Sequence, residues 1–337
     1  MKINFLKPGV KIILSCLLFF AIIIAGFFWF FPQKKVYHVG IISGTDFFEG
    51  TDQGFINKMT ELGYRENENI VYEIKKTNND MGEANEMIKK FVDGKVDLIF
   101  AFPTNAAILA KELTADTTIP VVFGSVTIEG SGLIQNLNYP GGNMTGVRQE
   151  TVETVVKRFE IMHKLAPNAK KYLIFYQSNL TIVPNELREL LSLAEKSGVQ
   201  LILEPVDSTS DIDFYLKEQE KKSSLDFDAI LTIIEPVAVI PSSAKVLAVF
   251  ADKHKIPFGG APLNDGEYQN LFGVSVDNVV VGGQSAVLAD KVLRGTPVGS
   301  IPIATAAKYI QINLKVAEKL GLKIDEDILS QANKIIR

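Results

Sequence analysis

The chain has 337 residues, which is the length of about two average domains. With 47% apolar and 22% charged residues, it has the composition of an ordinary globular protein, which excludes a disordered, collagen-like or disulfide-rich chain. The first 35 residues carry five lysines and no acidic residue, whereas the remainder carries 30 Lys and Arg against 39 Asp and Glu. A surface with this excess of negative charge repels phosphate backbones, so we expect no nucleic-acid partner.

Residues 12–31 form a run of 20 residues without a charge. As a helix that rises about 1.5 Å per residue, this run would span roughly 30 Å, the hydrocarbon thickness of a bilayer. Three lysines precede the run and two follow it, and the larger positive charge on the leading side predicts a cytoplasmic N-terminus. The sequence therefore predicts a transmembrane signal anchor over residues 1–35. It would cross a bacterial cytoplasmic membrane once and leave the rest of the chain on the extracytoplasmic side.

Two other fates of this segment stay open. A cleaved signal peptide has a shorter apolar core and a cleavage site of small residues, whereas this run ends in Phe-Phe-Trp-Phe-Phe-Pro. A lipoprotein would be acylated at Cys16, although the residues before it fit a lipobox poorly. Cys16 is the only cysteine, so the sequence predicts no internal disulfide and no thiolate metal site.

After residue 35, short β-branched runs alternate with helical patterns. The first half predicts strands over 36–43, 69–75, 96–102 and 119–124, and helices over 54–62, 82–91 and 105–113. The pattern restarts with helices over 152–165, 186–197 and 242–253, and strands over 171–176, 199–206, 229–234 and 256–260. Strands that alternate with helices are typical of an α/β protein with parallel sheets covered on both faces. Because crossovers between parallel strands are right-handed, we expect each half of the chain to form a doubly wound sheet.

The two halves also repeat each other in detail. Asp97 precedes a buried strand, and an Ile-Pro pair at 119–120 opens the next one; Asp228 and the Ile-Pro pair at 256–257 stand in the same relation. Such a repeat predicts two similar lobes. The glycine-rich turn at 141–146 is followed by a further strand, and we interpret it as a hinge between the lobes.

The sequence lacks the motifs of the common catalytic and metal sites. The three histidines, His38, His163 and His254, lack the spacing of a zinc site. There is no phosphate-binding G-x-x-x-x-G-K-[ST], no G-x-G-x-x-G and no G-x-S-x-G nucleophile motif. The acidic residues near position 50 suit the first turn of a helix, where negative charge is favourable. We therefore expect no catalytic residues, no metal, no cofactor and no enzyme activity.

Small and polar residues follow the strands at their carboxyl ends, where open α/β sheets bind ligands. They occupy positions 43–45, 103–105 and 124–127 in the first half, and 176–179, 235–236 and 259–261 in the second. Many stand beside a helix start, whose free N–H groups suit a carboxylate or another anion. Ordinary capping explains any one of them, whereas two lobes that face each other would bring all of them to one cleft.

Residues 37–322 resemble the ABC-transporter substrate-binding proteins of the tryptophan/tyrosine-binding type. The resemblance rests on an ordered series of short motifs: Gly54-Phe55, Glu61-Leu-Gly-Tyr64, Val96-Asp97-Leu-Ile, Ile119-Pro-Val-Val-Phe123, Pro140-Gly-Gly-Asn143-Met-Thr-Gly146-Val147, Ala251-Asp252, Ile256-Pro257, Gly273-Val-Ser-Val-Asp277, Leu293-Arg-Gly295 and Ile312 to Leu322. The family implies a type I periplasmic-binding fold with two doubly wound lobes joined by a hinge. The lobes would comprise residues 36–150 with about 278–303, and residues 151–277 with about 304–337.

The resemblance also implies the function. Such a protein captures a small solute, often an amino acid, and delivers it to the permease and ATPase subunits of an uptake transporter. Carried over by position, the ligand-binding residues are Thr45, Thr104, Asn105, Ser125, Thr127, Tyr176, Asn179, Glu235 and Gly260. The family usually has an Asp-Asn pair where this chain has Glu235 and Pro236, so a carboxylate is retained and an amide is lost.

Six residues of this set have a proposed role. Thr104, Asn105, Ser125 and Thr127 would hold a ligand carboxylate, and Glu235 would pair with an ammonium group. Phe47, Phe102 and Tyr176 would line the apolar part, although buried core suits Phe102 better. Arg148 would either clamp an acidic group or lie exposed at the hinge, and we favour the hinge. The alternative function is a ligand-binding sensor that acts through a separate membrane partner, because only about 11 residues precede the apolar run.

Overall fold

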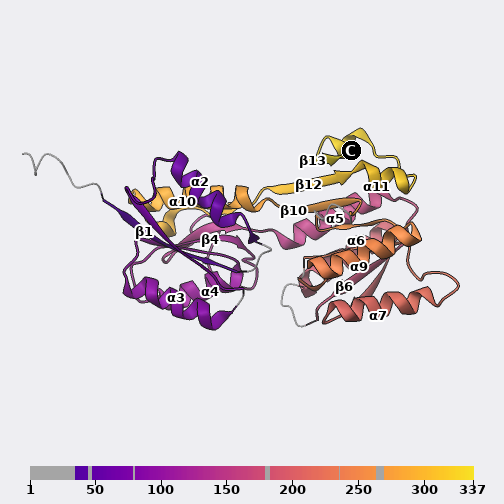
Figure 1. The fold of residues 1–337 in the computed structure, drawn as a ribbon, viewed down its shortest axis with the longest axis horizontal. Helices are drawn as coiled ribbons and strands as arrows, with labels where there is room; N and C mark the ends of the chain where they lie inside the picture. Colours follow the sequence, from indigo (N-terminus) through magenta and orange to yellow (C-terminus); the bar gives the residue numbers. More distant parts are fainter. Residues whose placement is uncertain (1–34, 45–47, 79, 179–182, 235, 263–268) are drawn as a thin grey trace, which may run out of the picture.

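The computed structural model describes residues 35–44, 48–78, 80–178, 183–234, 236–262 and 269–337. These residues form two lobes, each with its own sheet (Figure 1). The predicted membrane segment lies in residues 1–34, outside the described residues. No helix in the described part of the chain is long and apolar enough to cross a membrane.

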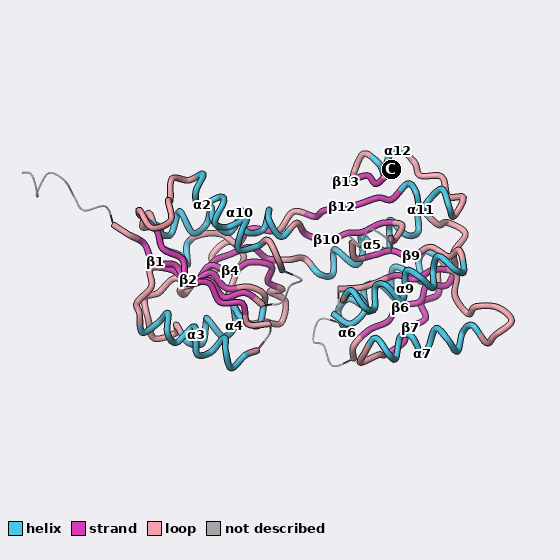
Figure 2. The backbone as a smooth tube through the Cα atoms, in the orientation of Figure 1, coloured by secondary structure: helices cyan, strands magenta, loops and turns pink. Residues whose placement is uncertain are grey.

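The first lobe is built on a six-stranded parallel sheet. Its strands lie in the order β11 (Ala304–Thr305), β5 (Met144–Arg148), β4 (Val121–Val126), β3 (Leu98–Ala101), β1 (Tyr37–Ser43) and β2 (Ile70–Lys76). Helices α2 (Thr51–Glu61) and α10 (Asn278–Leu293) cover one face, and α3 (Met81–Asp93) and α4 (Thr104–Leu113) cover the other (Figure 2). Successive strand residues point to opposite faces, so Ile41 packs against α2 and Ile42 against α3.

The second lobe is built on a seven-stranded sheet. Its strands lie in the order β13 (Lys334–Ile336), β12 (Lys308–Asn313), β10 (Phe272–Val276), β9 (Phe258–Gly260), β8 (Ala229–Leu231), β6 (Lys171–Tyr176) and β7 (Gln200–Pro205). Helices α5 (Thr151–Leu165) and α6 (Val183–Ser197) cover one face, and α7 (Thr209–Glu220) and α9 (Pro241–His254) the other. The remaining helices are short: α8 (Pro236–Val239), α11 (Leu314–Lys319), α12 (Glu326–Leu329) and the 3₁₀ helix η2 (Val298–Ser300).

The predicted strands and helices are present, and β6 has the predicted bounds. No helix or strand was assigned beyond residue 260, where the structure has β10 to β13 and α10 to α12. Three further details differ. The second sheet is not wholly parallel, because β12 returns from the first lobe and pairs antiparallel with β10. Strand β8 ends at Leu231 rather than at residue 234. Helix α7 was not predicted, because it buries only Ile212, Leu216 and Gln219; its capping box, Ser208 with Asp211, was the available signal.

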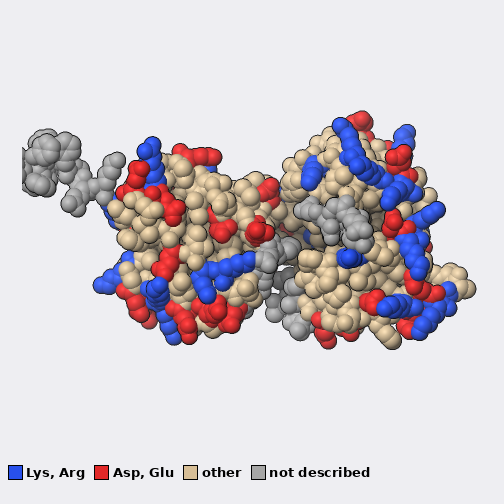
Figure 3. Space-filling view, in the orientation of Figure 1, with Lys and Arg blue, Asp and Glu red and all other residues tan. Residues whose placement is uncertain are grey.

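Three short segments connect the lobes. The chain crosses between β5 and α5, between β10 and α10, and between β11 and β12 (Figure 1). Both β5 and β10 reach a crossing at their carboxyl ends, and the strands parallel to them end on the same side. The carboxyl edges of both sheets therefore face the crossings. In the space-filling view the molecule narrows to a waist between the lobes (Figure 3).

The glycine-rich segment at 141–146, a turn over 141–143 followed by the start of β5, is not the hinge that the sequence suggested. Gly141 and Gly142 have positive φ values of 71° and 58°, and the turn packs against η2 within the first lobe, where the N–H of Gly141 donates to the carbonyl of Gly299 at 3.1 Å. The chain then runs along β5 before it crosses at residues 149–150. The lobe boundaries that the resemblance implies stay a prediction.

The sequence repeat corresponds to a repeated contact. In the first lobe, the carboxylate of Asp97 accepts a hydrogen bond from the N–H of His38 at 2.8 Å. In the second lobe, Asp228 accepts hydrogen bonds from the N–H groups of Lys170 and Lys171 at 2.8 and 2.9 Å. Each aspartate thereby ties the start of one central strand to the start of its neighbour.

Candidate functional site

The first-lobe half of the predicted site lies where β3 and β4 end. Helix α4 begins at Thr104, and its Oγ1 accepts a hydrogen bond from the N–H of Thr127 at 3.1 Å. The residue before the helix, Pro103, provides no side-chain cap, so the N–H groups of the first turn point outward without an intrahelical acceptor. Asn105 follows in the same turn and is exposed. The structure thus brings Thr104 and Thr127 together beside a helix start suited to an anion.

Ser125 has the most unusual environment of the predicted residues. It sits at φ 50°, in the left-handed region that non-glycine residues rarely adopt, within an irregular part of the β4–β5 ladder. Its side chain is only 3% exposed, and its Oγ has no hydrogen-bond partner among the described residues. A buried hydroxyl in a strained conformation is unfavourable unless a partner binds it. The Ser125 hydroxyl lies near the carboxyl edge of the sheet, and no described residue uses it as a donor or an acceptor.

In the second lobe, Gly260 and Tyr176 lie at the carboxyl ends of β9 and β6. Gly260 is the last residue of β9, has a φ of 130°, and lies so close to Thr232 that a Cβ would stand 2.2 Å from the Thr232 Oγ1. That hydroxyl accepts a hydrogen bond from the N–H of Ala261 at 2.8 Å. Tyr176 is half-buried at the end of β6 and packs against the lobe's core.

The remaining predictions have different outcomes. Thr45, Asn179 and Glu235, like Phe47, lie outside the described residues. Phe102 is wholly buried and packs on Phe100 with ring centroids 4.9 Å apart, so it belongs to the core and does not line the site. No hydrogen bond between described residues links Thr104, Ser125 or Thr127 to Tyr176 or Gly260.

Two buried charged residues near the second-lobe strand ends were not predicted. Arg158 on α5 donates to the carbonyls of Thr232 and Val274, and Glu186 on α6 accepts from the N–H of Ile234. Each lies on the apolar face of its helix, among residues such as Val155, Phe159, Met162, Val183 and Leu190. A charged residue within an apolar stripe was the signal that could have revealed them.

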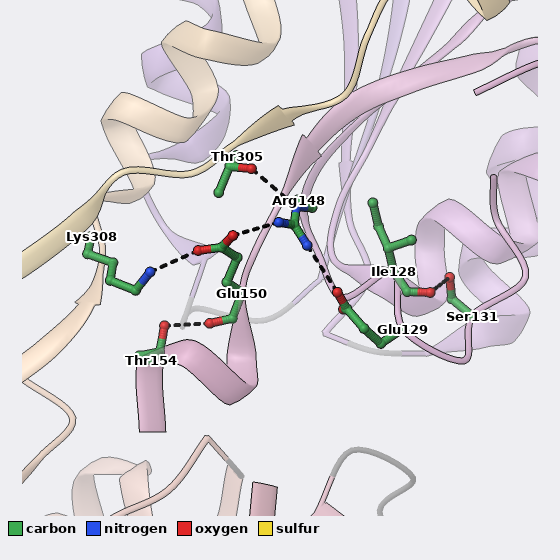
Figure 4. A network of polar contacts seen from close by, with 8 residues as sticks. All are labelled: Ile128, Glu129, Ser131, Arg148, Glu150, Thr154, Thr305 and Lys308. Carbon is green, nitrogen blue, oxygen red and sulfur yellow. Dashed lines mark hydrogen bonds and ion pairs between the residues drawn. The ribbon is translucent and has the colours of Figure 1, made fainter. Parts of the chain in front are cut away.

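Arg148 lies at the first crossing, where we expected it, but it is not exposed there, and it binds two carboxylates of the chain itself. Its side chain is 15% exposed and does not lie free at the hinge: Nη2 contacts Glu150 at 2.6 Å, Nη1 contacts Glu129 at 3.1 Å, and Nε donates to Thr305 at 3.2 Å (Figure 4). Lys308 contacts the other oxygen of Glu150 at 2.8 Å. The hydrogen bond from Lys308, with the charges of Lys308 and Arg148, lowers the pKa of Glu150. We call these residues the hinge network, because they join two of the three crossings.

Among the residues that the structure describes, no group of three His, Cys, Asp or Glu side chains is placed to hold a metal ion. Acidic and basic side chains are interspersed on the face that Figure 3 shows, rather than gathered in one basic patch. The chemistry at the described strand ends is that of hydroxyls, backbone N–H groups and an aromatic ring. Such groups bind a small polar molecule by hydrogen bonds and do not supply a nucleophile with its base.

Comparisons with known proteins agree with this geometry. The model of a family described as ABC transporter substrate binding protein matches residues 38–336. A tyrosine-binding protein of Clostridioides difficile is 27% identical over 277 residues, which are 81% of this chain and 77% of that protein.

Two solved structures have the same fold. A Streptococcus pneumoniae domain in complex with L-Trp aligns with a TM-score of 0.75 at 24% identity, covering 90% of this chain and 100% of that one. A ligand-free, open substrate binding protein with adhesive properties from Clostridium difficile aligns with a TM-score of 0.72 at 23% identity, covering 90% and 99%.

Proposed function

The chain belongs to the family of ABC transporter substrate binding proteins, and from this premise we propose that it captures an amino acid between its two lobes. Tyrosine and tryptophan are the first candidates, because a tyrosine-binding protein and an L-Trp complex are among its relatives. The lobes close on the ligand by bending at the three crossings and present it to the permease of an uptake transporter.

The observation that carries this proposal is the arrangement at the carboxyl edge of the first sheet. Ser125, whose Oγ has no hydrogen-bond partner in the described part of the chain, lies near the end of β4. Thr127, Thr104 and the start of α4 lie at this strand end and the neighbouring one. Hydroxyls and free N–H groups next to a helix start match the acceptor oxygens of a carboxylate. We assign the ligand carboxylate to this set, with Asn105 at its exposed side.

The second lobe contributes the other half of the proposed site. Tyr176 contributes an aromatic surface for the ligand side chain, and Gly260 lets the backbone approach the ligand closely. Glu235 and Asn179, both outside the described residues, are proposed as partners of the ligand ammonium group, and Thr45 as a further contact from the first lobe. A carboxylate that neutralises an ammonium ion would complete the recognition of a zwitterion.

We also propose that the protein works on the extracytoplasmic side of the membrane, tethered by residues 1–35. The uncharged run at 12–31 and the surplus of lysines before it support this assignment. Permease and ATPase subunits would be its partners, and the ATPase would supply the energy. The protein would thus deliver a captured solute without chemically changing it.

The test is a binding measurement on the full-length protein in a mild detergent. Thermal shifts and calorimetry are run with L-tyrosine, L-tryptophan, a branched-chain amino acid and a sugar. At 100 times its dissociation constant, a ligand stabilises the folded state by about 2.7 kcal/mol. Saturable binding of an aromatic amino acid, weakened in Ser125→Ala and Glu235→Gln, is the expected result. Binding of the sugar alone, or unchanged affinity in both variants, would contradict the proposed ligand class or site.

A further inference from the structure

Arg158 joins two strands of the second sheet that are not neighbours. Its Nε and Nη2 donate to the carbonyl of Val274 at 3.0 and 2.9 Å, and Nη1 donates to the carbonyl of Thr232 at 3.0 Å. Val274 lies in β10 and Thr232 directly follows β8, with β9 between them. The guanidinium, which is on a residue only 3% exposed, therefore bridges across a whole strand at the side that faces the crossings.

Glu186 binds the chain two residues after Thr232. It is fully buried on the first turn of α6, and its Oε2 accepts a hydrogen bond from the N–H of Ile234 at 3.3 Å. Residues 232–234 have left the strand and form no regular element. Two buried side chains of opposite charge therefore bind backbone groups at both ends of this short irregular segment.

Residues 232–234 in turn fix the position of the end of β9, the neighbouring strand. The Thr232 Oγ1 accepts the N–H of Ala261, and the Thr232 backbone lies against Gly260 so closely that no side chain fits between them. A displacement of Thr232 would displace Gly260 and Ala261 with it. Arg158 and Glu186 thus act on the second-lobe strand ends without being placed there themselves.

A role in core packing alone would not favour these residue types. Removing a charge from water costs several kcal/mol, and apolar side chains of similar volume often serve a core at least as well. The contact of Arg158 also depends on its planar fork of donors, which reaches two carbonyls at once; a lysine ammonium cannot do so in the same geometry. The side chains of Arg158 and Glu186 are therefore better suited to orienting backbone groups than to filling a core.

We infer that Arg158 and Glu186 are positioning residues, which hold residues 232–234, and through Thr232 also Gly260, in the conformation that the ligand site requires. The effect on ligand binding rests on the proposed function, whereas the role of Arg158 and Glu186 in fixing residues 232–234 does not. The segment would then be preformed in the unliganded protein, and ligand affinity would depend on two side chains that do not touch the ligand.

The first test needs no ligand. Hydrogen exchange is measured residue by residue on the full-length protein and on Arg158→Lys, which keeps the charge and loses the fork. We expect exchange at Thr232, Ile234 and Ala261 to accelerate about tenfold or more, the effect of losing a hydrogen bond to a charged group. Thr232→Val, which removes only the acceptor of Ala261, should accelerate Ala261 alone. Unchanged exchange at all three sites in Arg158→Lys would overturn the inference.

The matched control is Asn143→Ser in the first lobe. The Asn143 side chain also makes several internal hydrogen bonds, at 2.8 and 2.9 Å to Thr114 and Ile119, but it lies at the amino end of β5, away from the crossings. It should lower thermal stability and leave exchange in the second lobe unchanged. If Arg158→Lys does not fold, Glu186→Met, which has a similar length and no oxygen to accept the hydrogen bond, serves in its place, with accelerated exchange expected at Ile234.

The second test uses L-tyrosine and L-tryptophan as probes in calorimetry. We expect Arg158→Lys to weaken binding about tenfold or more, and Asn143→Ser to leave it unchanged at a comparable loss of thermal stability. Equal weakening in both variants would reduce Arg158 to a structural role and overturn the inference. If the unmodified protein binds neither amino acid, the proposed ligand fails, while the exchange experiment still decides whether Arg158 and Glu186 hold the segment.

Discussion

The Oγ1 of Thr104 accepts a hydrogen bond from the backbone N–H of Thr127 at 3.1 Å. This bond ties the start of α4 to the chain that leaves β4, so two neighbouring strand ends of the first sheet keep a constant spacing. Thr104→Val keeps the shape of the side chain and removes the acceptor. We expect it to lower the free energy of unfolding by about 1 kcal/mol and to weaken the binding of L-tyrosine.

Denaturant unfolding and calorimetry measure the two effects of Thr104→Val. Thr60→Val is the control, because the Thr60 hydroxyl is also hydrogen-bonded, to the carbonyl of Ile56, but lies exposed on α2. The control should leave binding unchanged. Equal ligand affinity in Thr104→Val and the unmodified protein would remove this threonine from the site.

Ser125→Gly should separate stability from binding. Glycine adopts the φ of 50° without steric cost, and the substitution also removes a buried hydroxyl that has no partner among the described residues. We expect the unliganded protein to become more stable by about 1 kcal/mol, and ligand affinity to fall because the Oγ is lost. Thermal melts with and without L-tyrosine measure both quantities. A less stable protein with unchanged affinity would show that this hydroxyl serves the fold alone.

Glu150→Gln tests the hinge network. Loss of the ionic contacts with Arg148 and Lys308 should lower the free energy of unfolding by about 1 kcal/mol at neutral pH. Because the pKa of Glu150 is lowered from its ordinary value of 4.5, its contribution is complete above that value and is lost as the pH falls through the folded-state pKa. The difference in the free energy of unfolding between the unmodified protein and Glu150→Gln should therefore become smaller at acidic pH.

Thermal melts between neutral and acidic pH measure this narrowing. Glu160→Gln is the control, because Glu160 is half-exposed and stands 3.9 Å from Lys157, too far for a strong pair. It should change stability little at any pH. A stability difference for Glu150→Gln that stays constant down to pH 3 would contradict an ionic role.

Substitution by alanine should change the stability of the protein in opposite directions at two adjacent glycines of α10. A Cβ on Gly282 would lie 2.0 Å from the carbonyl oxygen of Thr51, so Gly282→Ala must push α2 and α10 apart, at a cost of about 1 to 3 kcal/mol. A Cβ on Gly283 meets nothing closer than 3.8 Å, so Gly283→Ala should stabilise the helix by up to about 1 kcal/mol. Denaturant unfolding of both variants compares them directly. Similar changes in both would contradict the close contact of the two helices.

Gln311→Met should raise stability. Gln311 is 1% exposed in β12, and neither atom of its amide has a hydrogen-bond partner in the described part of the chain. Methionine has a similar length and no strongly polar group, so the change should raise the free energy of unfolding by about 1 to 3 kcal/mol. Thermal unfolding measures it. A fall in stability would indicate that a bound water or another group satisfies this amide.

The sequence by itself determined the local structure and its repetition. Strand and helix positions follow from the spacing of apolar residues, which depends only on neighbours along the chain. The equivalence of Asp97 and Asp228 was also readable, because each precedes a buried strand in the same local pattern. The threonines at the ends of β3 and β4 were found in the same way, since strand ends of a parallel sheet meet at one edge.

The tertiary structure alone decided how distant segments meet. The contacts of Arg148 with Thr305 and of Lys308 with Glu150 join residues more than a hundred positions apart. The antiparallel pairing of β12 with β10 joins strands that flank the whole of α10, and no local periodicity encodes such contacts. The positive φ of Ser125 and the hold of Arg158 on Thr232 are likewise products of packing, because surrounding strands and helices impose them on residues with no such preference of their own.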